Sequence, residues 1–203
     1  MIRSFIALEL SPEIYKNLGL LIDKLKKGVQ FTSARPSWVN PESIHLTLKF
    51  LGNIEESMID QIAEVMTNAA NETHPFSIRI RDLGVFPNPR QPRVLWCGMT
   101  KGEDQTVSIQ TKIDRGLAAL GFEKESRPFH PHLTLARIKT LKGTAALMDV
   151  VKSHQNSLVG ECRMDRVILF QSQLHPSGAV YTKLKEALFK QKGVSETEPS
   201  DVI

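Results

Sequence analysis

The spacing of apolar positions along the chain predicts alternating strands and helices. In residues 2–9 apolar side chains fall on both faces of an extended segment, which indicates a strand covered on both sides. Ser11 and Pro12 are typical of a helix start, and apolar residues then recur every three or four positions to about Lys27. Residues 31–41 contain two prolines and are predicted to form a loop.

The same patterns assign the remaining segments. We expect strands at residues 43–51, 76–85, 93–99, 129–138 and 163–173, and helices at residues 55–71, 103–120 and 141–154. Residues 87–92 are predicted to form a proline-rich loop and residues 176–178 a turn. Segment 179–189 fits a helix and a strand equally well. The polar tail, residues 191–203, is predicted to be disordered.

This order of elements predicts an α+β protein with antiparallel sheets. No glycine-rich turn follows a predicted strand, which argues against a nucleotide-binding parallel sheet. The order strand-helix-strand-helix occurs twice, so we expect two similar lobes that are interleaved along the chain. Residues 1–190 would then form a single bilobal domain with a central cleft.

Composition narrows the class of protein only slightly. The chain has 203 residues, a net charge of +4 and no apolar run near the roughly 20 residues that span a bilayer. The apolar start is too short for a signal peptide and lacks a cleavage site, so we expect a cytoplasmic protein. Cys97 and Cys162 stand singly in apolar surroundings and are expected to be free, buried thiols. The positive charge favours an anionic partner, but only weakly.

An internal repeat is the most informative feature of the sequence. The tetrapeptide His-Leu-Thr-Leu at residues 45–48 recurs at residues 132–135, 87 residues later. In a strand, successive side chains point to opposite faces, so each histidine shares a face with its threonine while the leucines point the other way. We therefore expect the leucines in the core, and two imidazoles and two hydroxyls around one pocket.

These residue types suit attack on a phosphate ester. Imidazole titrates near pH 6.5, so one histidine can take a proton from a nucleophile while the other gives one to a leaving oxygen. Threonine hydroxyls can donate to phosphoryl oxygens, and in-line displacement needs groups on opposite sides of phosphorus. Two other interpretations remain open. The histidines could be core residues, or His45, His130 and His132 could bind a metal, although neither motif contains a carboxylate or cysteine.

The context of the repeat resembles a known family. Residues 3–8, 38–52, 129–137 and 178–181 resemble the two-histidine phosphoesterase superfamily, in particular the RNA 2′,3′-cyclic phosphodiesterases once described as 2′-5′ RNA ligases. The resemblance runs from residue 2 to about residue 188. It implies two interleaved lobes, each an antiparallel sheet backed by helices, with the active site between them. It also implies a strand for segment 179–189.

The resemblance further implies hydrolysis of a terminal 2′,3′-cyclic phosphate to a 2′-phosphomonoester, without metal or cofactor. His45 would be the proton donor and His132 the proton acceptor, and Thr47 and Thr134 would hold the phosphate. Arg137 matches a family arginine close to the phosphate. Because it stands five residues after His132, an ideal strand would turn it to the opposite face, so a bulge or a strand end is required. The reverse reaction, 2′-5′ joining of RNA ends, would be a minor activity.

Other residues offer weaker signals for contact with RNA. Aromatic side chains that could stack on a base are Trp38, Trp96 and Phe129. Basic side chains that could contact the backbone are Arg79, Arg81, Arg90 and Arg93. Core packing or a solvated face explains each of them as well. The sequence thus leaves three hypotheses: a cyclic phosphodiesterase acting as a monomer on RNA ends or small cyclic nucleotides, a non-catalytic module that binds RNA ends, and a metal-dependent hydrolase.

Overall fold

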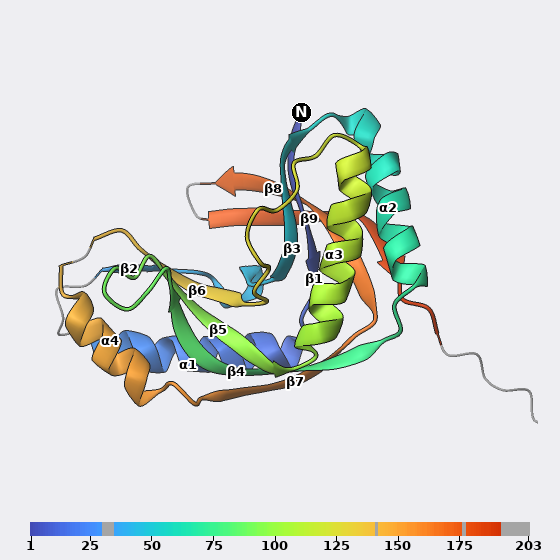
Figure 1. Ribbon diagram of the computed structural model, residues 1–203. Helices are drawn as coiled ribbons and strands as arrows, with labels where there is room; N and C mark the ends of the chain where they lie inside the picture. The colour runs from blue at the N-terminus through green and yellow to red at the C-terminus, as the bar shows by residue number, and fades with distance from the viewer. Residues whose placement is uncertain (30–34, 141, 176–177, 192–203) are drawn as a thin grey trace, which may run out of the picture.

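The computed structural model describes residues 1–29, 35–140, 142–175 and 178–191 (Figure 1). Its strands are β1 (Ile2–Leu8), β2 (Pro36–Trp38), β3 (Leu46–Ile54), β4 (Phe76–Phe86), β5 (Val94–Lys101), β6 (Leu133–Ile138), β7 (Leu158–Met164), β8 (Arg166–His175) and β9 (Gly178–Leu188). Its helices are α1 (Pro12–Val29), α2 (Ile59–Asn71), α3 (Glu103–Ala119) and α4 (Thr144–Ser153), with short 3-10 turns η1 (Pro41–Ser43) and η2 (Glu56–Met58).

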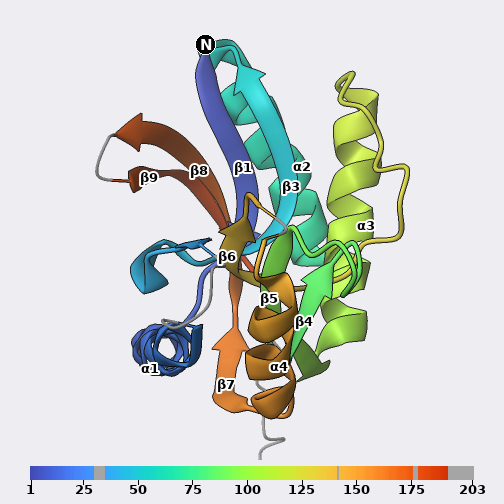
Figure 2. The same cartoon turned by 90° about the vertical axis from the view of Figure 1, so that its left-hand side faces the viewer.

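The strands form two antiparallel sheets. Sheet A has the order β3-β1-β8-β9, and sheet B has the order β2-β6-β5-β4-β7. Helices α2 and α3 lie beside sheet A, whereas α1 and α4 lie along sheet B (Figures 1 and 2). The predicted α+β class, with two lobes of antiparallel sheet backed by helices, is confirmed.

The lobes are interleaved, as predicted. The chain leaves sheet A after β1, forms α1 and β2 of the other lobe, and returns to sheet A with β3. It crosses back to sheet B with β4 and β5, and α3 then packs against α2 and β3 in the first lobe. Because each lobe contains early and late segments, the two cannot be separated by cutting the chain once.

Local sequence signals explain the helices well. At the start of α1 the Ser11 hydroxyl accepts a hydrogen bond from the Ile14 amide, 3.5 Å away, as expected for a capping serine. Apolar residues at helical spacing form its buried stripe: Ile14, Leu18, Leu21, Ile22, Leu25 and Val29. In the described part of the chain, no helix has both the length and the apolar character that a bilayer crossing demands.

The prediction of one strand over residues 163–173 is wrong. The chain forms two strands there, β7 in sheet B and β8 in sheet A, and it changes sheets at Asp165. The Asp165 carboxylate accepts from Arg166 at 2.9 Å, and its carbonyl oxygen accepts from the Phe189 amide at 2.8 Å. Apolar periodicity reports which face of a strand is buried but not which sheet the strand joins, so this crossing has no local signature.

Smaller differences concern element ends. The predicted loop at residues 31–41 contains β2, because residues 36–38 pair with β6. The ambiguous segment 179–189 is a strand, β9, as the resemblance implied. Three predictions fall partly outside the described residues: the helix start at Leu141, the turn at residues 176–177 and the tail beyond Gln191.

The two cysteines are free and buried, as predicted. Burial raises the pKa of the Cys97 thiol to about 12, so this group is unreactive near neutral pH.

Candidate active site

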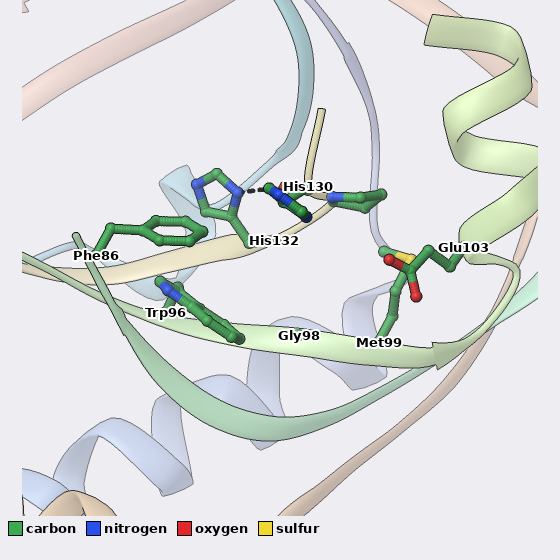
Figure 3. Close-up of a pocket in the computed structure, with 8 residues that line it drawn as sticks. Phe86, Trp96, Gly98, Met99, Glu103, His130 and His132 are labelled. Carbon is green, nitrogen blue, oxygen red and sulfur yellow. Dashed lines mark hydrogen bonds between the residues drawn. The ribbon is translucent and has the colours of Figure 1, made fainter. Parts of the chain in front are cut away.

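The two motif histidines stand immediately before strands β3 and β6, one in each sheet. The ring of His45 hydrogen-bonds through Nδ1 to the carbonyl oxygen of Ser43, 3.1 Å away. The ring of His132 bonds in the same way to the carbonyl oxygen of His130, at 2.7 Å (Figure 3). A carbonyl oxygen only accepts, so each Nδ1 carries the proton and each Nε2 is left free to take or give one.

The repeat predicts that each histidine shares a strand face with the threonine two residues later. The burial of β3 and β6, the strands that follow the histidines, shows whether their side chains alternate in the same way. In β3 and β6 the first six residues have the same order of burial: buried, half-buried, buried, buried, exposed, buried. The threonine of each motif is the half-buried second residue, and the leucines on either side of it are buried. The two motifs are therefore alike in burial as well as in sequence.

Each strand carries a bulge at the same place in the repeat. In the pairing of β1 with β3 the register skips Leu48, and in the pairing of β5 with β6 it skips Leu135. The extra residue reverses the alternation of faces after that point. Arg137 is therefore exposed on the same face as Thr134, and the bulge that its predicted role requires is confirmed.

The bulge in β3 exposes a residue that sequence reasoning missed. Phe50 is the counterpart of Arg137 in the first motif, and its side chain is 67% exposed. It pairs across the sheet with Phe5, with ring centroids 6.1 Å apart. Continuing the repeat by two residues past the tetrapeptide would have singled it out.

His45 lies in an aromatic cluster on sheet A. Its ring centroid is 4.7 Å from that of Phe170, 5.1 Å from Tyr181 and 5.8 Å from Phe5, each edge to face. Burial by these rings lowers the pKa of His45 below its usual value, and the Ser43 carbonyl and the Glu9 carboxylate partly offset the effect.

His132 lies in a second aromatic setting on sheet B. Its ring centroid is 5.0 Å from Phe86 and 6.5 Å from Trp96. Burial lowers the pKa of His132, the bond to the His130 carbonyl opposes this, and the nearby charges of His130 and Arg137 lower it further. The two imidazoles therefore share a tautomer and a direction of shift but differ in the charges near them.

Arg137 connects the two motif faces electrostatically. Its positive charge lowers the pKa of His132 on its own sheet, and it also counteracts the rise that burial causes in the pKa of Tyr181 on sheet A. Tyr181 in turn packs its ring against His45. The charge of Arg137 therefore acts on titratable groups of both sheets, His132 and Tyr181.

The threonine hydroxyls are free to bind a ligand. Thr47 and Thr134 are half-buried, and neither hydroxyl forms a hydrogen bond with another residue in the described part of the chain. Between them, the two motif faces carry two hydroxyl donors, one guanidinium and two imidazole Nε2 atoms, a set suited to a phosphate.

A cavity of about 200 Å³ opens beside His132 (Figure 3). Its lining comes from sheet B, from the start of α3 and from the segment before β6, and consists of Phe86, Trp96, Gly98, Met99, Glu103, His130, Pro131 and His132. Because α3 belongs to the lobe of sheet A, both lobes contribute to it.

The other candidate residues have structural partners. Trp38 and Phe129 pack against the core. Arg79 pairs with Glu161 at 2.6 Å, and Arg81 with Asp82 at 3.3 Å. These contacts explain the positions of all four side chains, and no ligand is needed to explain them.

The remaining candidates add little to the site. Arg93 donates to the carbonyl oxygen of Lys139 at 3.1 Å, and Arg90 is exposed on the loop after β4. Within residues 1–29, 35–140, 142–175 and 178–191, no three His, Cys, Asp or Glu side chains are grouped so as to hold a metal ion. The proposed ligand set of His45, His130 and His132 is therefore not assembled. The core-histidine interpretation is also unsupported, because both motif rings are only half-buried.

Comparison with known proteins identifies the family of the chain. The chain matches the family described as the 2′-5′ RNA ligase superfamily over residues 14–176. It is 34% identical to a protein of Methanothermobacter thermautotrophicus named RNA 2′,3′-cyclic phosphodiesterase, over 91% of this chain and 97% of that one. It is 36% identical to a Bacillus subtilis protein of the same name, over 69% of this chain and 74% of that one.

Solved structures show the same fold. A protein of Thermus thermophilus superposes with a TM-score of 0.75 and 27% identity, covering 94% of this chain and all of that one. Escherichia coli LigT, crystallised with 3′-AMP, superposes with a TM-score of 0.71 over 94% of this chain and 99% of its own. Its 22% identity supports the fold alone.

Proposed function

The chain belongs to the 2′-5′ RNA ligase superfamily, and we propose that it hydrolyses the terminal 2′,3′-cyclic phosphate of RNA to a 2′-phosphomonoester. The relatives named RNA 2′,3′-cyclic phosphodiesterase support this substrate, since they match most of the chain. The observation that carries the proposal is the matching hydrogen bond of the two motif histidines. Each is locked by a backbone carbonyl in the tautomer that leaves Nε2 available for proton transfer.

In the proposed reaction the histidines act as acid and base. His132 takes a proton from water through Nε2, and the water oxygen bonds to phosphorus opposite the 3′ oxygen. The bond between phosphorus and the 3′ oxygen breaks, and the protonated Nε2 of His45 gives its proton to that oxygen. The products are a 2′-phosphomonoester and a free 3′-hydroxyl, and solvent returns each ring to its starting state.

Neighbouring charges support this assignment of roles. The acid must carry a proton. Burial lowers the pKa of His45, and the Glu9 carboxylate, which is paired with Lys183 at 2.6 Å, acts in the opposite direction and favours the charged ring. The base must be neutral, and the charge of Arg137 disfavours the charged form of His132. The opposite assignment would put the cationic ring beside the cationic guanidinium.

Thr47, Thr134 and Arg137 would hold the phosphate. The hydroxyls donate to the non-bridging oxygens, and the guanidinium balances the negative charge that these oxygens share in the transition state. Phe50, exposed on the face of Thr47, offers an aromatic surface for the base of the nucleoside that bears the cyclic phosphate.

The proposal is tested with an adenosine 2′,3′-cyclic phosphate hydrolysis assay. Replacing either His45 or His132 with alanine should slow turnover about 10²- to 10⁴-fold, the usual contribution of a positioned acid or base. His74, an exposed histidine bonded to the Lys190 carbonyl, provides the control: His74→Ala should retain the wild-type rate. Phosphorus NMR should identify the 2′-monoester. A 3′-monoester would mean that the 2′ oxygen, and not the 3′ oxygen, is the leaving group. Full activity in the double histidine variant would refute the mechanism.

The proposal also covers metal dependence, RNA joining and assembly. Activity should be unaffected by EDTA, and binding of the cyclic phosphate without product would favour the non-catalytic module instead. By microscopic reversibility, a 5′-hydroxyl can replace water and give a 2′-5′ linkage. The family description, 2′-5′ RNA ligase superfamily, supports this linkage, and we propose it as a minor activity. We further propose that residues 1–190 act as one unit, as a monomer, in the cytoplasm.

A further inference from the structure

Trp96 forms an aromatic platform beside His132. It stands on β5 in register with Gly84 on β4 and with Thr134 on β6. A Cβ added at Gly84 would overlap the carbons of the indole, and one added at Gly98 would lie 3.1 Å from the ring. Two glycines on adjacent strands therefore let the indole lie flat against the backbone of sheet B.

The position of this ring depends on packing. Its Nε1 is buried and has no hydrogen-bond partner among the residues that the structure describes. Its neighbours are Phe86, with ring centroids 5.1 Å apart, and the ring of His132. One face of the indole rests on the glycines, and Trp96 also lines the cavity beside His132 (Figure 3). The part of the indole that lines the cavity is suited to stacking on a nucleobase, because every base has a π-face.

The proposed mechanism determines which nucleoside this surface meets. The ribose that carries the cyclic phosphate lies on the side of the leaving 3′ oxygen, next to His45. The nucleophile enters from the opposite side, next to His132. The cavity borders His132, His130 and Pro131 and contains none of the aromatic residues around His45. It therefore lies on the side of the incoming nucleophile.

We infer that this cavity binds the nucleoside of a second RNA end, the one whose 5′-hydroxyl replaces water as the nucleophile. This inference rests on the proposed function and names a second substrate for the same site. The 5′ oxygen gives its proton to Nε2 of His132 and bonds to phosphorus, while the bond to the 3′ oxygen breaks and that oxygen takes the proton of His45. A 2′-5′ phosphodiester and a 3′-hydroxyl form, and no other reactant is needed.

Glu103 specifies the kind of nucleoside. It is the first residue of α3, it is exposed, and it lies in Figure 3 at the end of the cavity away from Phe86. A carboxylate accepts hydrogen bonds from ribose hydroxyls and repels phosphate. We therefore expect Glu103 to accept from the 2′- and 3′-hydroxyls of the second nucleoside, while its 5′-hydroxyl faces His132.

The first experiment measures how each turnover divides between water and a second nucleoside. The wild type and variants are incubated with cytidine 2′,3′-cyclic phosphate and increasing adenosine, and the ratio of 2′-5′ dinucleotide to cytidine 2′-phosphate is measured by mass spectrometry. The ratio should saturate with adenosine, and AMP, which has no 5′-hydroxyl, should give no dinucleotide and serves as the control for the nucleophile. Trp96→Leu should lower the ratio about tenfold, since base stacking contributes roughly 1–3 kcal/mol. Glu103→Gln should lower it about threefold. Leu158→Ala, an exposed apolar residue on β7 of the same sheet, is the control and should leave the ratio unchanged.

The outcomes separate this inference from the proposed function. A ratio that rises linearly with adenosine and is the same in all variants would overturn the inference while leaving the hydrolase intact. A raised KM for the cyclic nucleotide in Trp96→Leu, with an unchanged ratio, would also overturn it, because the cavity would then hold the base of the first nucleoside.

A second experiment does not depend on turnover. The chain has two tryptophans, so Trp38→Phe leaves Trp96 as its only indole. Adenosine stacked on Trp96 should quench its fluorescence saturably, and Gly84→Ala, which displaces the ring, should weaken the quenching. If adenosine gives no saturable quenching, the inference fails even when the protein has no activity on cyclic phosphates.

Discussion

His45 and His132 form the same hydrogen bond, from ring Nδ1 to the carbonyl oxygen two residues earlier in the chain. The bond holds each ring by its own backbone segment, so orientation does not depend on the partner lobe. Proton transfer is left to Nε2 in both cases. What distinguishes the two rings is therefore the surrounding charge, and this difference leads to predictions for pH dependence.

Hydrolysis should be fastest on the acid side of neutrality. Burial lowers the pKa of both histidines below 6.5 in the free protein. The rate needs His45 protonated and His132 neutral, so kcat/KM should follow a bell whose maximum lies below pH 6.5. A bound phosphate anion raises both pKa values, so the kcat profile should lie at higher pH. A kcat/KM maximum above pH 7 would contradict the arrangement.

Removing the positive charge of Arg137 should change both binding and titration. Arg137→Ala should raise KM about tenfold, because a charge-assisted hydrogen bond to phosphate is lost. It should also raise the pKa of His132, since the guanidinium lowers it in the wild type. The acid limb of kcat/KM should then move to higher pH. Arg163→Ala, an exposed arginine on β7, should leave the limb in place, and an equal movement in both variants would argue against a direct effect.

The threonine hydroxyls should contribute to the rate without contributing to the fold. Thr47→Val and Thr134→Val each remove one donor to the phosphate and should lower kcat about tenfold, with little change in Tm. Thr111 is a suitable control because its hydroxyl bonds to the Val107 carbonyl of its own helix. Thr111→Val should keep the wild-type kcat, and a loss of activity equal to that of the site variants would remove the proposed role.

Lys49 should matter for stability because the bulge in β3 turns it inward. Its side chain is 5% exposed, and its ammonium donates to Asp114 on α3 at 2.7 Å and to the carbonyl oxygen of Glu123 at 2.6 Å. Lys49→Met leaves a largely buried carboxylate without its partner and should lower the free energy of unfolding by about 3 kcal/mol.

The control for this variant is Lys26→Met. Lys26 pairs with Asp23 at the surface, where the two side chains are 46% and 65% exposed, so its loss should change stability by less than about 0.5 kcal/mol. Urea unfolding followed by circular dichroism measures both. Equal urea midpoints for the two variants would show that the buried hydrogen bonds of Lys49 add nothing to stability.

The sequence by itself determined the family resemblance and most of the elements, and it predicted the residues that carry the chemistry. The repeat identified His45, Thr47, His132 and Thr134, because a strand's period of two places alternate residues on one face whatever the partner strand is. Helical spacing likewise placed α1 and α3 to within a few residues. Such signals are local, and they survive in any fold that buries the apolar face.

Only the tertiary structure decided which strands pair and where their register slips. The bulges at Leu48 and Leu135, which expose Phe50 and Arg137 on the faces of Thr47 and Thr134, arise in the pairing with the partner strands β1 and β5. The change of sheet at Asp165 and the flat seat of the Trp96 indole have the same origin. Each depends on contact between residues far apart in the chain. The order of apolar and polar positions in one segment does not indicate which other segment packs beside it in space.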